Sequence, residues 1–152
     1  MTRKTARQIA VQILFSMETN ALSADEALEL FFSPGHYESL GGEDSGFEET
    51  PDEKGVSYIR RLTEAVDEHR AELDETIARY ARGWKIERLS AATRTILRAA
   101  LCEILYFDDV PDSAAVNEAV ELGKAFDSPE AAAFINGVLG SCLRAEKPEK
   151  PE

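Results

Sequence analysis

The fold is indicated most strongly by Val110–Leu139, VPDSAAVNEAVELGKAFDSPEAAAFINGVL. Apolar residues recur in it every three or four positions, which is the pattern of amphipathic helices. Ser128 followed by Pro129 is a favourable pair of N-cap and first helical residue. The stretch therefore predicts two helices, over residues 112–126 and 129–144.

The second of these helices breaks helix rules in its interior. Asn136 and Gly137 interrupt its apolar stripe, and Gly140 follows closely. A glycine inside a helix costs roughly 0.5–1 kcal/mol relative to alanine. We therefore expect another backbone or a ligand to approach closely here. Asn117 and Asn136, if both point inward, would hydrogen-bond each other or helix-end groups, which is a structural role.

The rest of the chain also lacks the alternating pattern of strands, so we expect an all-α fold of six or seven helices in two packed subdomains. Ser23 and Glu26 have the spacing of a capping box, and Ser90 is placed to cap a strongly apolar helix. The further helices are predicted over residues 5–17, 24–32, 56–82 (with a break near His69, and ended by Gly83) and 91–107.

We expect one domain over residues 1–145, with N-terminal helices within 5–82 and C-terminal helices within 84–144. The segment Ser33–Gly55 is rich in glycine, proline, serine and acidic residues, and it predicts an irregular acidic surface loop over 33–55. The charged, proline-bearing residues 146–152 predict a disordered tail.

Composition describes an ordinary globular chain of 152 residues, 43% hydrophobic and 30% charged. No apolar stretch reaches the roughly 20 residues that span a bilayer, and no signal peptide is recognisable. Cys102 and Cys142 lie on apolar helical faces, which predicts buried thiols in a reducing compartment. We expect a cytoplasmic protein without a membrane partner.

Taken as an average, the net charge of −12 argues against binding of nucleic acid, but the charges are unevenly distributed along the chain. The first seventeen residues hold three cations and no acid, and residues 79–98 hold six cations against Glu87 alone. Because salt screens charges beyond about 8–10 Å, local patches matter more to a polyanion than the sum. The cations are Arg3, Lys4 and Arg7 in the first patch and Arg79, Arg82, Lys85, Arg88, Arg94 and Arg98 in the second.

On a helical wheel of the first helix, the three cations avoid the apolar arc, and Phe15 falls on their side. A ring beside cations can stack on unpaired bases while phosphates are neutralised. The alternative is a solvated basic N-terminus with Phe15 under a neighbouring helix.

Arg94 and Arg98, at positions i and i+4, form one helical ridge. They could bind RNA or pair with surface acids. The connector Trp84–Ile86 and the basic segment around it could face RNA, a protein partner or solvent. Lys124 shares a polar face with Asn117 and Glu121 and is uninformative alone.

Catalysis finds little support in the sequence. His36 and His69 have no second histidine or cysteine at metal-ligand spacing, and neither a phosphate-binding loop nor a nucleophile elbow is present. We expect no enzyme activity, no metal and no cofactor.

Several segments resemble the NusB family, in the family's order. They are TARQIAVQILFSME at the start, ILRAALCEI (Ile96–Ile104), the proline Pro111, VNEAVELGK (Val116–Lys124) and FINGVL (Phe134–Leu139). The resemblance implies an all-α fold of two subdomains with Gly137 and Gly140 at a close helix contact. It implies a transcription antitermination and rRNA transcription factor that binds single-stranded boxA RNA with the ribosomal protein NusE in the elongation complex.

Carried over by position, the resemblance implies RNA contacts at the basic residues of the first helix, at Phe15 (where the family often has tyrosine) and near Phe134. Lys124 and Arg98 are further candidates. The short basic arm and the acidic segment favour dependence on the protein partner. The full set of predicted RNA-binding residues is Arg3, Lys4, Arg7, Phe15, Arg98, Lys124 and Phe134.

Two other functions remain open at this point. One is a NusB-like accessory protein of an rRNA cytosine methyltransferase, although we expect no cofactor-binding domain on this chain. The other is a protein-only adaptor, which the charge of −12 would suit. Family members also occur as monomers and dimers, and a homodimer that covers the basic helix would inhibit RNA binding.

Overall fold

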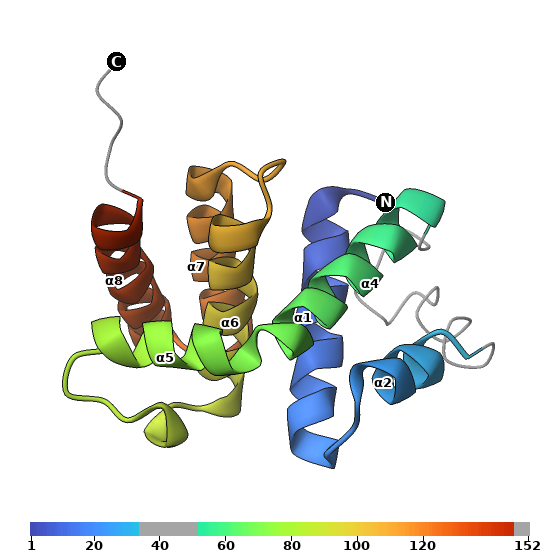
Figure 1. Ribbon diagram of the computed structural model, residues 1–152, viewed down its shortest axis with the longest axis horizontal. Helices are drawn as coiled ribbons and strands as arrows, with labels where there is room; N and C mark the ends of the chain where they lie inside the picture. The colour runs from blue at the N-terminus through green and yellow to red at the C-terminus, as the bar shows by residue number, and fades with distance from the viewer. Residues whose placement is uncertain (34–51, 148–152) are drawn as a thin grey trace. The chain divides into compact units, whose positions relative to one another are not determined.

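The computed structural model describes residues 1–33 and 52–147, and in these ranges it contains only helices and connections (Figure 1). The prediction of an all-α fold with six or seven helices is confirmed for the described residues. The helices are α1 (Arg3–Asn20), α2 (Ala24–Phe31), α4 (Glu53–Glu68), α5 (Arg70–Tyr80), α6 (Ala91–Tyr106), α7 (Asp112–Phe126) and α8 (Pro129–Glu146), with a 3₁₀ turn η1 (Ile86–Arg88).

Most of the predicted acidic loop over 33–55 and of the tail over 146–152 lies outside the described residues. In the described parts of these two segments, the helices extend further than predicted. α4 begins at Glu53 rather than Val56, and α8 ends at Glu146.

The predicted helix starts are confirmed by their caps. Ser23 Oγ accepts a hydrogen bond from the Glu26 amide at 3.1 Å, and Glu26 Oε1 accepts one from the Ser23 amide at 3.1 Å. Ser90 and Ser128 cap α6 and α8 in the same way through their hydroxyl groups, with Pro129 in the first turn of α8. Such caps satisfy amides that a helix leaves without intrahelical partners.

The chain divides into two compact units, Met1–Asp67 and Glu68–Glu152. The boundary coincides with the predicted break near His69, where α4 ends and α5 begins. α5 therefore belongs to the second unit, whereas the sequence analysis grouped residues up to Arg82 with the first helices.

In the first unit, α1 packs against α2, and the core consists mainly of aliphatic side chains from α1, α2 and α4. The buried arc predicted for the first helix is confirmed, because Ile9 and Ile13 are fully buried. Leu28, Ile59 and Leu62 are also fully buried in this unit, and the rings of Phe31 and Tyr58 are buried as well.

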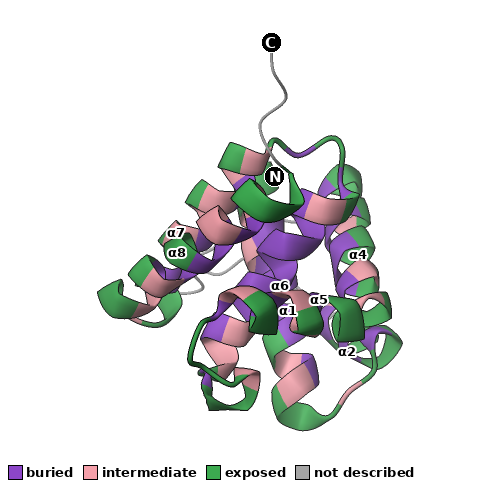
Figure 2. Cartoon of the chain, turned by 60° about the vertical axis from the view of Figure 1, so that its left-hand side comes forward, coloured by how far each residue is buried: buried purple, intermediate pink, exposed green. Residues whose placement is uncertain are grey.

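In the second unit, α7 packs against both α6 and α8, and α5 contacts α6 and α8. Most residues of α6 are buried, which agrees with the apolar character of its sequence (Figure 2). Thr93, Thr95, Arg98 and Glu103 are buried polar residues on this helix.

The glycine at the close helix contact is Gly123, so the prediction for Gly137 and Gly140 is wrong. A Cβ at Gly123 would lie 2.9 Å from Ile135 Cδ1 and 3.1 Å from Ala132 Cα, both on α8. A Cβ at Gly137 would meet no atom within 4 Å. At Gly140 the only such neighbour is Arg144 Nη1, at 3.4 Å on the same helix.

Asn117 and Asn136 are both exposed. The inward orientation on which their predicted structural role depended is therefore absent, and neither amide needs a buried partner.

Candidate nucleic-acid interface

The first turn of α1 forms a positively charged surface on the first unit. Thr2 Oγ1 accepts a hydrogen bond from the Thr5 amide at 3.1 Å and so starts the helix. Arg3 and Lys4 follow, both exposed, and no acidic residue lies in this turn. The partial positive charge of the helix N-terminus adds to these two cations.

Arg3 is held in place by an aromatic ring of α4. Its guanidinium carbon lies 4.1 Å from the centroid of the Tyr58 ring, within the range of a cation–π interaction. Tyr58 is only 5% exposed, so the ring is a fixed support for the arginine. The contact limits the conformations of Arg3 and lowers the entropy that binding would cost.

A shallow depression surrounds Arg3, with a volume of about 490 Å³. Its lining includes the cations Lys54 and Arg61 of α4, which the sequence analysis missed. Their spacing was a usable signal, because residues at i, i+3, i+4 and i+7 share one helical face. The six lining residues carry three cations and one carboxylate: Arg3, Glu53, Lys54, Ser57, Tyr58 and Arg61.

Phe15 is 40% exposed, so it is a surface ring and is not sealed under a neighbouring helix. The helical wheel placed Arg7 away from the apolar arc, but Arg7 is buried and only 5% exposed. The solvent-facing basic surface of α1 therefore consists of Arg3 and Lys4. Phe15 lies about 16 Å further along the helix than Lys4, at 1.5 Å per residue.

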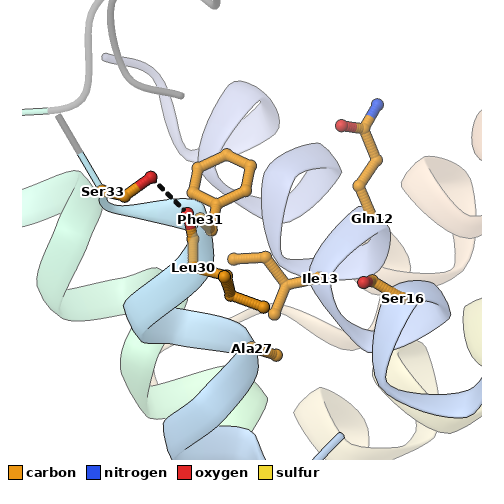
Figure 3. A pocket seen from close by; sticks show the side chains of 7 residues that line it. All are labelled: Gln12, Ile13, Ser16, Ala27, Leu30, Phe31 and Ser33. Atoms are coloured by element: carbon orange, nitrogen blue, oxygen red, sulfur yellow. Dashed lines mark hydrogen bonds between the residues drawn. The ribbon is translucent and has the colours of Figure 1, made fainter. Parts of the chain in front are cut away.

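A second depression of the first unit lies between α1 and α2, with a volume of about 440 Å³ (Figure 3). Gln12, Ile13 and Ser16 line it from α1. On the opposite side Ser33 Oγ donates to the Leu30 carbonyl at 2.8 Å, and Leu30 itself is 59% exposed. This surface is mainly apolar and carries no cation among its lining residues, which also include Ala27 and Phe31.

The predicted ridge of Arg94 and Arg98 is not a surface feature. Arg98 is 7% exposed and forms an ion pair with Asp74 of α5, with Nε 2.6 Å from Oδ1. Arg94 Nη1 donates to backbone carbonyls of the preceding connector, those of Ile86 at 3.4 Å and of Leu89. Both arginines therefore contribute to the internal structure of the second unit.

Lys124 and Phe134 are the predicted site residues of the second unit that reach its surface. Lys124 is exposed and its ammonium group lies 3.4 Å from Glu121 Oε1. Phe134 is half-buried, and its ring packs edge-on against Trp84, with centroids 6.1 Å apart. From the sequence, RNA, a protein partner and solvent all remained open as the surroundings of Trp84.

The described residues contain no group of three or more histidine, cysteine, aspartate or glutamate side chains that could hold a metal ion. His69 stacks on the Tyr106 ring, with centroids 4.0 Å apart, and His36 lies outside the described residues. No described helix combines the length and apolar character that crossing a membrane requires.

The chain is thus an all-α protein of two small units, with basic and aromatic side chains exposed on its first helix. The sequence model of the NusB family matches residues 4–144, and the chain belongs to this family. The resemblance seen in the sequence is therefore confirmed.

Two curated relatives are both called transcription antitermination protein NusB. The protein of Symbiobacterium thermophilum is 40% identical over 147 residues, which cover 97% of this chain and 92% of the relative. The protein of Myxococcus xanthus is 38% identical over 137 residues, which cover 90% of this chain and 91% of the relative.

Solved structures show the same fold. NusB of T. maritima has a TM-score of 0.79 at 25% identity and covers 95% of this chain and 92% of its own. A crystal structure of NusB and NusE in complex with double-stranded RNA has a TM-score of 0.77 at 22% identity. That likeness covers 94% of this chain and 96% of the other and concerns the fold alone.

Proposed function

We propose that this chain is a transcription antitermination factor that binds single-stranded boxA-type RNA together with the ribosomal protein NusE, as part of the elongation complex. The observation that carries the proposal is the 40% identity over nearly the whole length to a transcription antitermination protein NusB. A solved NusB complex of the same fold contains NusE and double-stranded RNA, so NusE and RNA are the partners to test, while the choice of a single strand comes from the family resemblance.

The surface of α1 suits an unpaired strand. Arg3 and Lys4 would neutralise phosphates at the positive end of the helix, and Phe15 would stack on a base further along it. Such stacking tolerates any base, so sequence preference must come from further contacts. Lys54 and Arg61, beside Arg3, extend the surface that attracts phosphate.

The buried arginines have a different role in the proposal. Arg7 and Arg98 are too enclosed to reach a phosphate directly, and Arg98 instead pairs with Asp74 inside the second unit. Lys124 and Phe134 remain proposed contacts because they reach the surface of the second unit.

The proposed activity is binding, without a catalytic step and without a cofactor. It requires nascent RNA and a ribosomal protein, so the proposal places the chain in the cytoplasm. The charge of −12 opposes RNA over most of the surface, and a complex with NusE would supply affinity that the few exposed cations of α1 lack.

The test is a titration of a labelled uridine- and adenosine-rich single strand with the full chain, with and without NusE, at two salt concentrations. The proposal expects binding that NusE strengthens and that salt weakens. Each lost phosphate contact should reduce the slope of log K against log salt by about 0.7. Binding of NusE without any gain from RNA would instead support a protein-only adaptor.

A further inference from the structure

Trp84 is an exposed indole in a basic connector of the second unit. It is 54% exposed, and it lies between α5 and α6, next to the half-buried ring of Phe134 on α8. The two rings are 6.1 Å apart with an interplanar angle of 64°, an edge-to-face arrangement that leaves much of the indole surface in solvent. The proposed function assigns no role to Trp84.

The connector holds this indole in a defined place. Gly83 has a φ of +79°, which favours glycine, and it turns the chain after α5. The Trp84 amide then donates to the Ala81 carbonyl at 3.0 Å. Arg94 of α6 donates to the carbonyls of Ile86 and Leu89 and so braces the other end of the connector.

The charges around Trp84 favour a polyanion. Arg82, Lys85 and Arg88 are all exposed, and Glu87 is the one acidic residue of the segment 82–88. The side chains of these three cations form no ion pair with any residue of 1–33 or 52–147. A ring platform flanked by cations without internal partners is the composition of single-strand binding surfaces.

Next to Phe134, the surface of α8 has no side chain at Gly137. Gly137 follows Phe134 by three residues on α8 and therefore shares its face. A Cβ at Gly137 would meet no atom within 4 Å. The surface of α8 beside Phe134 is therefore open at Gly137.

We propose that Trp84 and Phe134 form a second aromatic platform, on which a base of single-stranded RNA stacks while Arg82, Lys85 and Arg88 neutralise its phosphates. The proposal rests on the proposed RNA-binding function and adds a site on the second unit. Single-stranded RNA is favoured over a protein partner because cations outnumber acids three to one along the connector.

Trp84 is the single tryptophan of the chain, so its fluorescence reports on this site directly. The experiment titrates the full chain, with and without NusE, with a uridine- and adenosine-rich single strand and follows the indole emission. Stacking should quench the emission in step with binding measured by the anisotropy of labelled RNA. Heparin, a polyanion without bases, should compete with the RNA for the cations but leave most of the Trp84 emission unquenched.

Substitutions separate stacking from folding. Trp84→Ala should weaken RNA binding roughly 5- to 150-fold, the range for loss of one stacked base, while Trp84→Phe should retain most of the affinity. Phe126→Ala is the matched control, because Phe126 is a 39% exposed ring at the end of α7 in the same unit. Far-ultraviolet circular dichroism should show an unchanged helix content for all three variants.

The outcomes distinguish this proposal from the function on which it rests. RNA binding with unchanged emission and normal affinity of Trp84→Ala would overturn the platform and leave the proposed function intact. The same variant losing affinity for NusE but not for RNA would overturn it in favour of a protein contact. Absence of any RNA binding would overturn both.

Discussion

Arg98 and Asp74 form a two-point ion pair between α6 and α5. Arg98 Nε donates to Asp74 Oδ1 at 2.6 Å, and Nη2 donates to Oδ2 at 3.0 Å. The arginine side chain is 8% exposed and the carboxylate 27% exposed. This geometry makes the pair a stabilising contact inside the second unit, because each charge is satisfied by a partner of matching shape.

Replacing Asp74 with alanine should therefore destabilise the protein. The substitution removes the carboxylate that pairs with a mostly buried guanidinium. We expect the free energy of unfolding to fall by about 2–3 kcal/mol. This is less than the roughly 3–5 kcal/mol for breaking a fully buried pair, because Asp74 is partly exposed. Chemical denaturation measures the loss. Glu121→Ala is the control, since it removes the exposed pair with Lys124 and should change stability by less than about 1 kcal/mol. Equal effects of the two variants would contradict this interpretation.

Two glycine substitutions should have opposite effects on stability. In Gly123→Ala the new methyl group meets Ile135 Cδ1 at 2.9 Å and the backbone of Ala132 at 3.1 Å, so the buried Ile135 side chain must shift and the Ala132 backbone must give by a few tenths of an ångström. Such overpacking costs about 1–3 kcal/mol. Gly137→Ala meets no atom within 4 Å and should stabilise α8 by about 0.5–1 kcal/mol through helix propensity. Thermal unfolding should lower the midpoint of the first variant and raise that of the second.

Tyr106 should titrate well above an ordinary tyrosine. Its hydroxyl donates to Glu72 Oε2 at 2.7 Å, and this hydrogen bond raises the pKa of Tyr106 to about 12. The folded state holds the proton more tightly than the unfolded chain, so this stabilisation is present below about pH 10 and is lost as the pH rises towards 12. The same hydrogen bond lowers the pKa of Glu72. The stability that the ionised Glu72 contributes is therefore lost as the pH falls below the ordinary range of a glutamate.

Alkaline difference spectra of the wild-type chain and Tyr106→Phe isolate this one phenol among the four tyrosines. In Glu72→Ala the pKa of Tyr106 should fall towards 10, because the acceptor is gone. A phenol that titrates identically with and without Glu72 would show that the hydrogen bond is absent in solution.

Both cysteines should be inert in the folded protein. Cys102 and Cys142 are 0% and 1% exposed and form no disulfide bond, and burial raises the pKa of Cys142 to about 11. Because the thiolate is the reactive form, a thiol reagent at neutral pH should label neither residue until the chain is unfolded. Rapid labelling of the native protein would contradict the buried positions.

The sequence predicted the helices well because their signals are local. The capping box of Ser23 and the Ser128–Pro129 pair act within one turn, and the apolar period follows from helix geometry alone. The burial of Arg7 and Arg98 was not predictable in this way. A helical pattern gives no information on contacts with residues distant in sequence, such as Asp74, the partner of Arg98.

Only part of the candidate site was predicted, because a sequence pattern reports on one helix at a time. The wheel of the first helix placed Phe15 on the side of the cations but left open whether a neighbouring helix covers it, and the ring is exposed. The support of Arg3 by Tyr58 joins two helices, and the pairing of Trp84 with Phe134 joins a connector to a helix distant in sequence. No periodicity within a single helix contains that information.

The most direct measurement of the central claim is the affinity of single-stranded RNA for Phe15→Ala, in the presence of NusE and at constant salt. Loss of one stacked base should cost about 1–3 kcal/mol of binding free energy. Leu30→Ala is the matched control, because it removes another exposed apolar side chain of the first unit, 59% exposed, and should bind as the wild type does. Equal affinity of Phe15→Ala, Leu30→Ala and the wild-type chain for the RNA would contradict the assignment of the α1 surface to an unpaired strand.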